Sequence, residues 1–173
     1  EMFFEDAITV SRELELTLTG KSCGQEDRAP MCGIPYHAVD GYLNRLINKG
    51  YRVAICEQVE DPKAAKGLVK REVTRIVTPG TNLNTQAMDE TKNNYLMGIT
   101  YLDSFFGVST VDVTTGDYYV TQVEELRQAM DEIIKFSPSE LVYNSTLELS
   151  GMDLSDLKNR LNIALTPLQD WYF

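Results

Sequence analysis

Apolar residues recur at helical spacing in two segments of the first half of the chain, 2–14 and 39–47. Gly50 follows the second of these expected helices, as glycine commonly does just past a helix end. Around the helices lie short runs in which apolar and polar positions alternate or β-branched residues dominate, a pattern typical of strands. These strands are expected at residues 16–19, 31–34, 51–59 and 69–77.

Polar and turn-forming residues mark the breaks between these elements. The stretch 20–29 is expected to be a loop, and residues 61–67 a short helix with Asp61 as its cap. The turn residues 78–80 end the last strand of this half. The polar stretch 81–94 after them predicts a linker between two domains.

After the linker the pattern changes to closely spaced strands. Three strands separated by tight polar turns predict an antiparallel meander. An amphipathic helix follows it, and then a short strand that is expected to pair in parallel and a last short helix. The strands are expected at 95–101, 105–113, 118–123 and 141–143, and the helices at 124–136 and 154–161. The sequence therefore predicts a mixed α/β (α+β) fold with two small domains, residues 1–80 and 95–173.

The composition is that of a globular protein, with 43% hydrophobic and 24% charged residues among 173. Its 16 basic and 26 acidic side chains give a net charge of −10, which is unevenly spread. Residues 1–92 hold 12 basic and 14 acidic side chains, whereas residues 93–173 hold 4 and 12. Segment 44–75 is locally basic, with eight basic and four acidic side chains. A polyanion is therefore expected to be tolerated by the first half and repelled by the second, although a solvated face is the alternative explanation of the basic segment.

The three cysteines, Cys23, Cys32 and Cys56, are not spaced as zinc ligands, and their odd number favours a reducing compartment. Cys56 lies in an apolar run and is expected to be buried. No apolar run approaches the roughly 20 residues of a membrane span. We therefore expect a cytoplasmic protein with no membrane partner.

Three carboxylates on or beside the expected meander form the one enzyme-like set: Asp103, Asp112 and Asp117. The order of three strands, a helix and a strand is that of a ribonuclease-H-like sheet, in which clustered carboxylates hold magnesium for phosphodiester cleavage. The alternative is that Asp103 and Asp117 are ordinary turn residues, as their neighbours Ser104 and Gly116 suggest. Neither a nucleotide-binding glycine loop nor a nucleophile elbow is present in the sequence.

Four phrases in the first half, in order and at matching spacing, resemble one family. They are EMFFEDA (1–7), PMCGIPYHA (30–38), AICEQ (54–58) and REVTRIVTPGT (71–81). On these phrases the chain resembles MutS, a family of bacterial DNA mismatch-repair proteins. The resemblance is close up to about residue 82 and looser beyond it, where it lies in the order of elements and the turn Thr114-Thr115-Gly116. It implies a mixed-sheet mismatch-recognition domain followed by part of a ribonuclease-H-like connector domain without nuclease activity.

The resemblance also implies a Phe-x-Glu motif, whose phenylalanine enters the minor groove and whose glutamate hydrogen-bonds the mispaired base. A mispair is already weakly stacked, so a wedge that unstacks a base step and bends the duplex meets less resistance there. The phrases align Glu1 with the motif glutamate, and the motif phenylalanine then precedes the chain, which we expect to be a piece of a longer protein. Phe3-Phe4-Glu5 imitates the motif, but in this alignment Phe3 and Phe4 are core residues.

Further DNA contacts are implied for Lys21, Arg71 and Arg75 as phosphate partners, and for Pro30 and Met31 near the minor groove, where plain packing is the alternative. No catalytic residue, metal or cofactor is implied for this piece, which is not expected to be an enzyme. ATP and magnesium belong to the family's ATPase domain, and dimerisation to other domains. The implied partners are double-stranded DNA with mispaired or unpaired bases and, through the connector, MutL. An acidic protein-interaction module without DNA binding is a further alternative.

Overall fold

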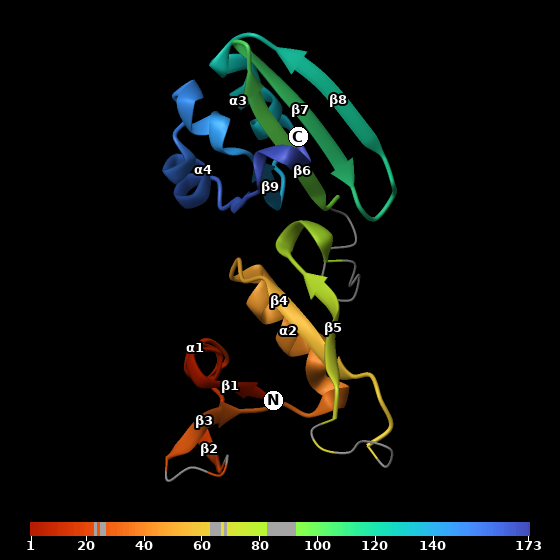
Figure 1. Ribbon diagram of the computed structural model, residues 1–173. Coiled ribbons are helices and arrows are strands. Elements are labelled where there is room, and N and C mark those ends of the chain that lie inside the picture. The colour runs from red at the N-terminus through yellow and green to blue at the C-terminus, as the bar shows by residue number, and fades with distance from the viewer. Residues whose placement is uncertain (23, 25–26, 63–66, 68, 83–92) are drawn as a thin grey trace. The chain divides into compact units, whose positions relative to one another are not determined.

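The computed structural model (Figure 1) describes residues 1–22, 24, 27–62, 67, 69–82 and 93–173. The short helix expected at 61–67 and the linker expected at 81–94 lie largely outside these residues. The chain divides into two compact units, Glu1–Val53 and Ala54–Phe173. Both contain helices and strands, and the described residues form three sheets in all, which confirms the expected mixed α/β class.

The first unit holds a three-stranded antiparallel sheet in the order β1-β3-β2. Its strands are β1 (Met2–Phe3), β2 (Thr19–Ser22) and β3 (Arg28–Cys32). Its helices are α1 (Phe4–Leu14), the 3-10 turn η1 (Tyr36–Ala38) and α2 (Val39–Asn48). Helix α1 packs on β1 and β3, and the unit buries Ala7, Leu14, Ala29, Cys32, Leu43, Leu46 and Ile47.

Strand positions in this unit differ from the sequence-based expectation. Residues 20–22, expected in a loop, continue β2, and β3 begins at Arg28 rather than at Met31. The reason is that backbone pairing with β3 holds β2, while most β2 side chains remain exposed. A strand whose side chains face water needs no apolar alternation, so the pattern did not reveal it.

The start of the chain also differs, because Met2 and Phe3 pair with Cys32 and Met31 as a strand before α1 begins. Phe4 takes a left-handed φ of 52° and is 63% exposed. The expectation that Phe4 is a core residue is therefore wrong, whereas Phe3 is half-buried.

The second unit holds a five-stranded sheet in the order β10-β9-β6-β7-β8. The strands are β6 (Tyr95–Leu102), β7 (Phe105–Asp112), β8 (Tyr118–Val123), β9 (Glu140–Tyr143) and β10 (Ala164–Pro167). The antiparallel meander and the parallel pairing of β9 with β6 confirm the expected ribonuclease-H-like order. Strand β10, parallel to β9, was not expected, because its four residues end in a proline and show no clear alternation.

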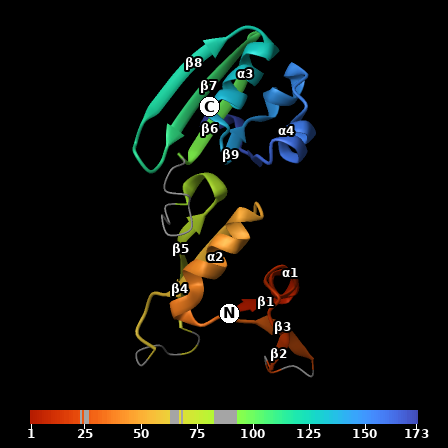
Figure 2. The same ribbon diagram turned by 180° about the vertical axis from the view of Figure 1, so that it is seen from behind.

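Helix α3 (Leu126–Phe136) runs along one face of this sheet (Figure 2), as its apolar stripe predicts. Ala129 and Ile133 of this helix are fully buried against β7 and the rest of the core. The 3-10 helix η3 (Ser145–Ser150) and α4 (Leu154–Arg160) add Leu147 and Leu157 to the same core. A further 3-10 turn, η4 (Asp170–Tyr172), follows β10. None of the helices in the described part of the chain is long and apolar enough to span a membrane.

The remaining strands, β4 (Val53–Gln58) and β5 (Arg71–Val77), form a two-stranded ribbon. Residues 71–76 are all exposed. Cys56 is exposed too, so its expected burial is wrong. The apolar run around it resembles a strand of a core sheet, but a ribbon of two strands leaves many of its side chains open to solvent.

Candidate nucleic-acid interface

Three of the predicted DNA-contacting residues share one face of the three-stranded sheet. The register places Phe3 and Thr19 on either side of Met31. Because alternate residues along a strand point to the same face, Glu1 lies on this face beside Phe3, and Lys21 lies on it beside Thr19. The sheet thus gathers side chains from three separate segments of the sequence.

Specific contacts hold this face together. Lys21 Nζ lies 2.8 Å from Glu1 Oε2, with the two side chains 47% and 55% exposed. The same ammonium lies 5.3 Å from the centroid of the Phe3 ring, and Thr19 Oγ1 donates to the carbonyl of Met31 at 3.0 Å. An exposed ion pair is worth only about 0–1 kcal/mol, so an incoming ligand with its own charges can separate the two groups at little cost.

Phe3 and Thr19 were not singled out from the sequence. Their place beside Glu1, Lys21 and Met31 depends on the register of β1, β3 and β2, and the expected loop at 20–29 concealed that register. The alternation at 16–19 was the available signal, and it ended where β2 begins.

Pro30 is also in β3, but its side chain projects to the face opposite that of Met31, because neighbouring residues in a strand alternate. Gly20 is the cross-strand partner of Pro30. Of the two predicted minor-groove residues, Met31 therefore shares a face with Glu1 and Lys21, and Pro30 does not.

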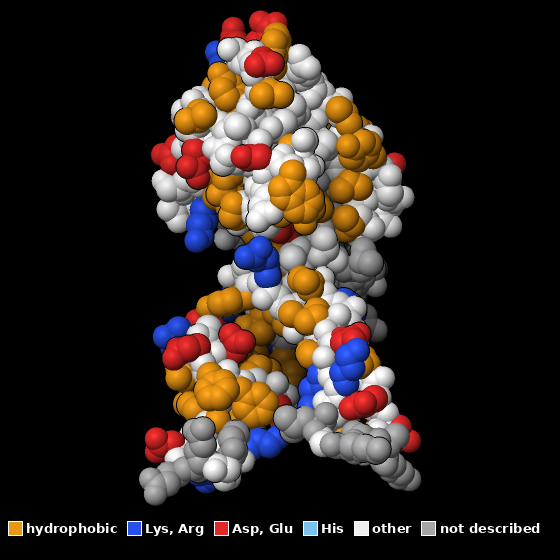
Figure 3. Space-filling view, viewed as in Figure 1, with side chains coloured by type: hydrophobic (Ala, Val, Ile, Leu, Met, Phe, Trp, Pro, Cys, Tyr) orange, Lys and Arg blue, Asp and Glu red, His pale blue; other side chains and the backbone are white. Residues whose placement is uncertain are grey.

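The two predicted phosphate-binding arginines, Arg71 and Arg75, lie on the same face of β5, four residues apart. This spacing separates them by about 13 Å along the strand, so each can meet a different phosphate. Arg71 Nη1 donates to the carbonyl of Val69 at 3.1 Å. Lys70 and Glu72 form an exposed ion pair at 2.5 Å, and basic and acidic side chains lie interspersed on the ribbon (Figure 3). These arginines belong to the second compact unit, and Glu1, Lys21 and Met31 to the first.

The three carboxylates of the nuclease alternative do not form one cluster. Asp103 lies in the turn between β6 and β7, and Asp112 at the far end of β7. From Phe105 to Asp112 the strand rises about 23 Å, which is too far for a shared metal site. Among the residues that the structure describes, no group of three or more His, Cys, Asp or Glu side chains could hold a metal ion.

Asp112 and Asp117 instead organise the turn between β7 and β8. Asp112 is fully buried, and its Oδ1 accepts from the backbone N–H of Thr114 at 2.9 Å and from its hydroxyl at 2.6 Å. Burial alone would raise the pKa of the Asp112 carboxyl, but these hydrogen bonds outweigh it and lower the pKa below its ordinary value. Asp117 accepts from the hydroxyl of Thr115 at 2.8 Å.

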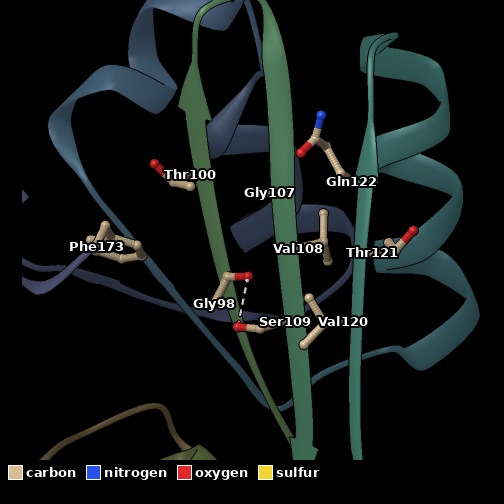
Figure 4. A pocket seen from close by; sticks show the side chains of 9 residues that line it. All are labelled: Gly98, Thr100, Gly107, Val108, Ser109, Val120, Thr121, Gln122 and Phe173. Atoms are coloured by element: carbon tan, nitrogen blue, oxygen red, sulfur yellow. Dashed lines mark hydrogen bonds between the residues drawn. The ribbon is translucent and has the colours of Figure 1, made fainter.

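A hollow of about 520 Å³ lies on the five-stranded sheet (Figure 4). Ser109 Oγ there donates to the carbonyl of Gly98 at 3.5 Å. None of its described lining residues is charged or a histidine, so the lining offers no acid, base or metal-ligand set. The lining consists of Gly98, Thr100, Gly107, Val108, Ser109, Val120, Thr121, Gln122 and Phe173.

Comparison with known proteins agrees with the motifs of the first half and extends the match to the second. The family model of MutS domain I matches residues 1–86, and that of MutS domain II matches residues 94–173. The chain belongs to the MutS family. Its MutS relatives include the DNA mismatch repair protein MutS of Lachnoclostridium phytofermentans, 68% identical over 173 residues, which are 100% of this chain and 19% of the relative.

Two other relatives with the name DNA mismatch repair protein MutS cover all of this chain. The protein of Acetivibrio thermocellus is 52% identical over 176 residues, and that of Clostridium tetani is 51% identical over 174 residues. In each case the match covers 20% of the relative. This MutS chain therefore spans about a fifth of the length of the relatives that it matches.

The MutS domain models and the compact units divide the chain at different places. The domain models meet between residues 86 and 94, whereas the compact units meet between Val53 and Ala54. The ribbon of β4 and β5 consequently lies within MutS domain I by sequence but, apart from Val53, belongs to the second compact unit.

Proposed function

We propose that this chain is part of a MutS protein that recognises mispaired or unpaired bases in duplex DNA at the start of repair. The observation that carries the proposal is the match of the chain to MutS domains I and II, with relatives named for DNA mismatch repair. The exposed face with Glu1 and Lys21 supports it, because this face offers a carboxylate and an ammonium beside the apolar side chains of Phe3 and Met31.

In this proposal Glu1 is the glutamate of the Phe-x-Glu motif, and the motif phenylalanine precedes it in the parent protein. The ring unstacks a base step, which costs less at a mispair than in paired duplex. The Glu1 carboxylate then forms a hydrogen bond with the displaced base. On paired DNA the same carboxylate meets only phosphate charge, which disfavours binding and so adds to specificity.

Arg71, Arg75 and Lys21 supply sequence-independent affinity by neutralising phosphates. ATP and magnesium bind in the parent outside the residues of this chain, which has no enzymatic role of its own. The connector carries the contact with MutL, and other domains of the parent form the dimer. Because the three carboxylates of the second unit are not clustered, the nuclease alternative has no support from the described residues.

The test uses the full-length parent and measures its affinity for a duplex with one G·T mispair and for the matched duplex. Glu1→Ala is expected to reduce the ratio of the two affinities by about fivefold or more, since a base-specific hydrogen bond is worth about 1–3 kcal/mol. Glu5→Ala is the matched control, because Glu5 is the exposed glutamate of the motif-like run Phe3-Phe4-Glu5. A ratio that Glu1→Ala leaves unchanged, or that Glu5→Ala reduces instead, would contradict the assignment.

A further inference from the structure

A buried glutamate of the second unit accepts a hydrogen bond from the turn that follows β5, the strand with Arg71 and Arg75. Glu140, the first residue of β9, is 2% exposed. Its Oε2 accepts from the backbone N–H of Gly80 at 3.0 Å, and its Oε1 accepts from Thr166 Oγ1 at 2.6 Å. A buried carboxylate is costly unless hydrogen bonds satisfy it, and here each oxygen has a donor.

Gly80 belongs to η2 (Pro79–Thr81), a 3-10 turn that fits closely against the five-stranded sheet. A Cβ on Gly80 would lie 2.8 Å from Glu140 Cβ and 2.9 Å from Leu96 Cδ1. Leu96 and Glu140 are direct cross-strand neighbours on β6 and β9. Only glycine therefore fits at this contact without displacing the turn or the strands.

Further hydrogen bonds hold the same turn. The side-chain amide of Asn94 donates to the carbonyls of Pro79 at 3.1 Å and Asn82 at 3.2 Å. Thr78 and Thr81 close the turn with reciprocal capping bonds, of which the backbone N–H of Thr78 donates to Thr81 Oγ1 at 3.0 Å. Hydrogen bonds and close packing therefore hold the turn η2 in a defined position on the five-stranded sheet.

Strand β5 ends at Val77, which is 4% exposed, immediately before this turn. We propose that Glu140 is a positioning residue for DNA binding: it fastens the end of the strand that carries Arg71 and Arg75 to the five-stranded sheet. The turn that follows β5 contacts β6 and β9, which joins the ribbon to the second unit although its sequence matches MutS domain I. The consequence of this docking for DNA rests on the proposed function, whereas the docking itself does not.

Substitutions at Glu140 separate hydrogen bonding from packing. Glu140→Ala removes both acceptors. Glu140→Gln retains the contact, because its amide oxygen can accept from Gly80 while its amide N–H donates to the hydroxyl of Thr166. Gly80→Ala undocks the turn from the other side by steric overlap. Glu148→Ala is the matched control, an exposed glutamate of the same unit.

The first experiment measures docking in the full-length protein with spin labels at Glu72→Cys on β5 and Gln122→Cys on β8, after other accessible cysteines are replaced by serine. Glu140→Ala and Gly80→Ala are expected to widen the distribution of label-to-label distances by about twofold or more, as a released segment samples more conformations. Glu140→Gln and Glu148→Ala are expected to leave it unchanged. A role in stability alone would lower the melting temperature of Glu140→Ala but leave the distribution of the folded protein narrow, which would overturn the proposal.

The second experiment measures affinity for the mispaired duplex over a range of salt concentrations. Glu140→Ala is expected to weaken binding roughly three- to tenfold, because the arginines lose their fixed placement, and Glu140→Gln to restore it. Arg71→Glu with Arg75→Glu tests the phosphate contacts directly. If this double variant weakens binding while Glu140→Ala changes neither affinity nor label distances, the positioning role is wrong and the proposed function stands. If the double variant binds as the parent does, the phosphate contacts are wrong, and the label distances alone decide the docking.

Discussion

The ribbon of β4 and β5 and the five-stranded sheet use charged side chains in opposite ways. In the ribbon, Arg71 and Arg75 lie on an exposed strand. In the sheet, Asp112 and Glu140 are almost completely buried. Asp112 Oδ1 and both carboxylate oxygens of Glu140 accept hydrogen bonds from neighbouring turns and strands. The two sheet carboxylates therefore stabilise the fold through internal hydrogen bonds. The charged side chains of the ribbon lie at the surface, where a polyanion can reach them.

Apolar side chains show the same difference. Val73 of the ribbon is 56% exposed, whereas Phe106 and Ile133 of the sheet unit are nearly or fully buried in one core. The ribbon consequently adds little burial of its own, and its placement depends on the docked turn that follows it. Substitutions in the two regions should thus differ in kind, with stability affected in the sheet and binding in the ribbon.

The largest difference is expected between two truncations to alanine. Phe106→Ala should lower the free energy of unfolding of its unit by about 3–5 kcal/mol, because it leaves a cavity in the core. Val73→Ala in the ribbon should change it by no more than about 0.5 kcal/mol. Chemical denaturation of both variants checks this, and comparable losses in the free energy of unfolding would show that Val73 is part of a buried core.

A smaller difference is expected between two threonine hydroxyls. Thr166 donates to the buried Glu140 carboxylate at 2.6 Å, and Thr74 donates to the exposed carbonyl of Ile55 at 3.3 Å. Thr166→Val should cost about 2–3 kcal/mol, because a bond to a charged buried group is lost. Thr74→Val, which changes the side chain in the same way, should cost about 0.5 kcal/mol or less. Equal costs in thermal or chemical unfolding would argue against a special role of the Glu140 contact.

The smallest of the three expected stability differences is that between the parent and Asp112→Asn, and it should depend on pH. Asp112→Asn keeps one acceptor for Thr114 but buries an amide in place of a carboxylate, at a cost of about 1–2 kcal/mol at neutral pH. Because folding lowers the pKa of Asp112, its contribution is fully present above about pH 4 and is lost as the pH falls through the lower pKa of the folded state. The difference in stability between parent and variant should therefore narrow below pH 4, as denaturation at several pH values would show. A difference that widens in acid would contradict the sign of the shift.

The sequence predicted most of the five-stranded sheet and its main helix, because these segments have strong periodicity. Helix α3 lies within the expected 124–136, and the three meander strands begin where alternation and turn residues place them. Strand β2, whose side chains mostly face water and show no alternation, was misplaced. The burial of Cys56 was wrongly predicted, because an apolar run does not reveal whether a second layer of structure covers the strand.

The candidate site was predictable only in its parts. The family resemblance pointed to Glu1, Lys21 and Met31 separately, but their common face follows from a three-strand register that no local pattern encodes. Glu140 gave no sequence signal, because it stands among polar residues at the start of a short strand. Its partner Gly80 lies 60 residues earlier, and only the fold brings the two together.

The central claim is that the arginines of the β4–β5 ribbon contact DNA, whereas the five-stranded sheet and its helices do not. The most direct test is the salt dependence of binding of the full-length protein to a mispaired duplex. Arg71→Glu with Arg75→Glu should make the slope of log K against log salt shallower by about 2, close to 1 for each lost phosphate contact. Lys158→Glu with Arg160→Glu, an equal charge change on the exposed surface of α4, should leave the slope as it is in the parent. An unchanged slope in the arginine variant, or an equal change in both variants, would contradict the claim.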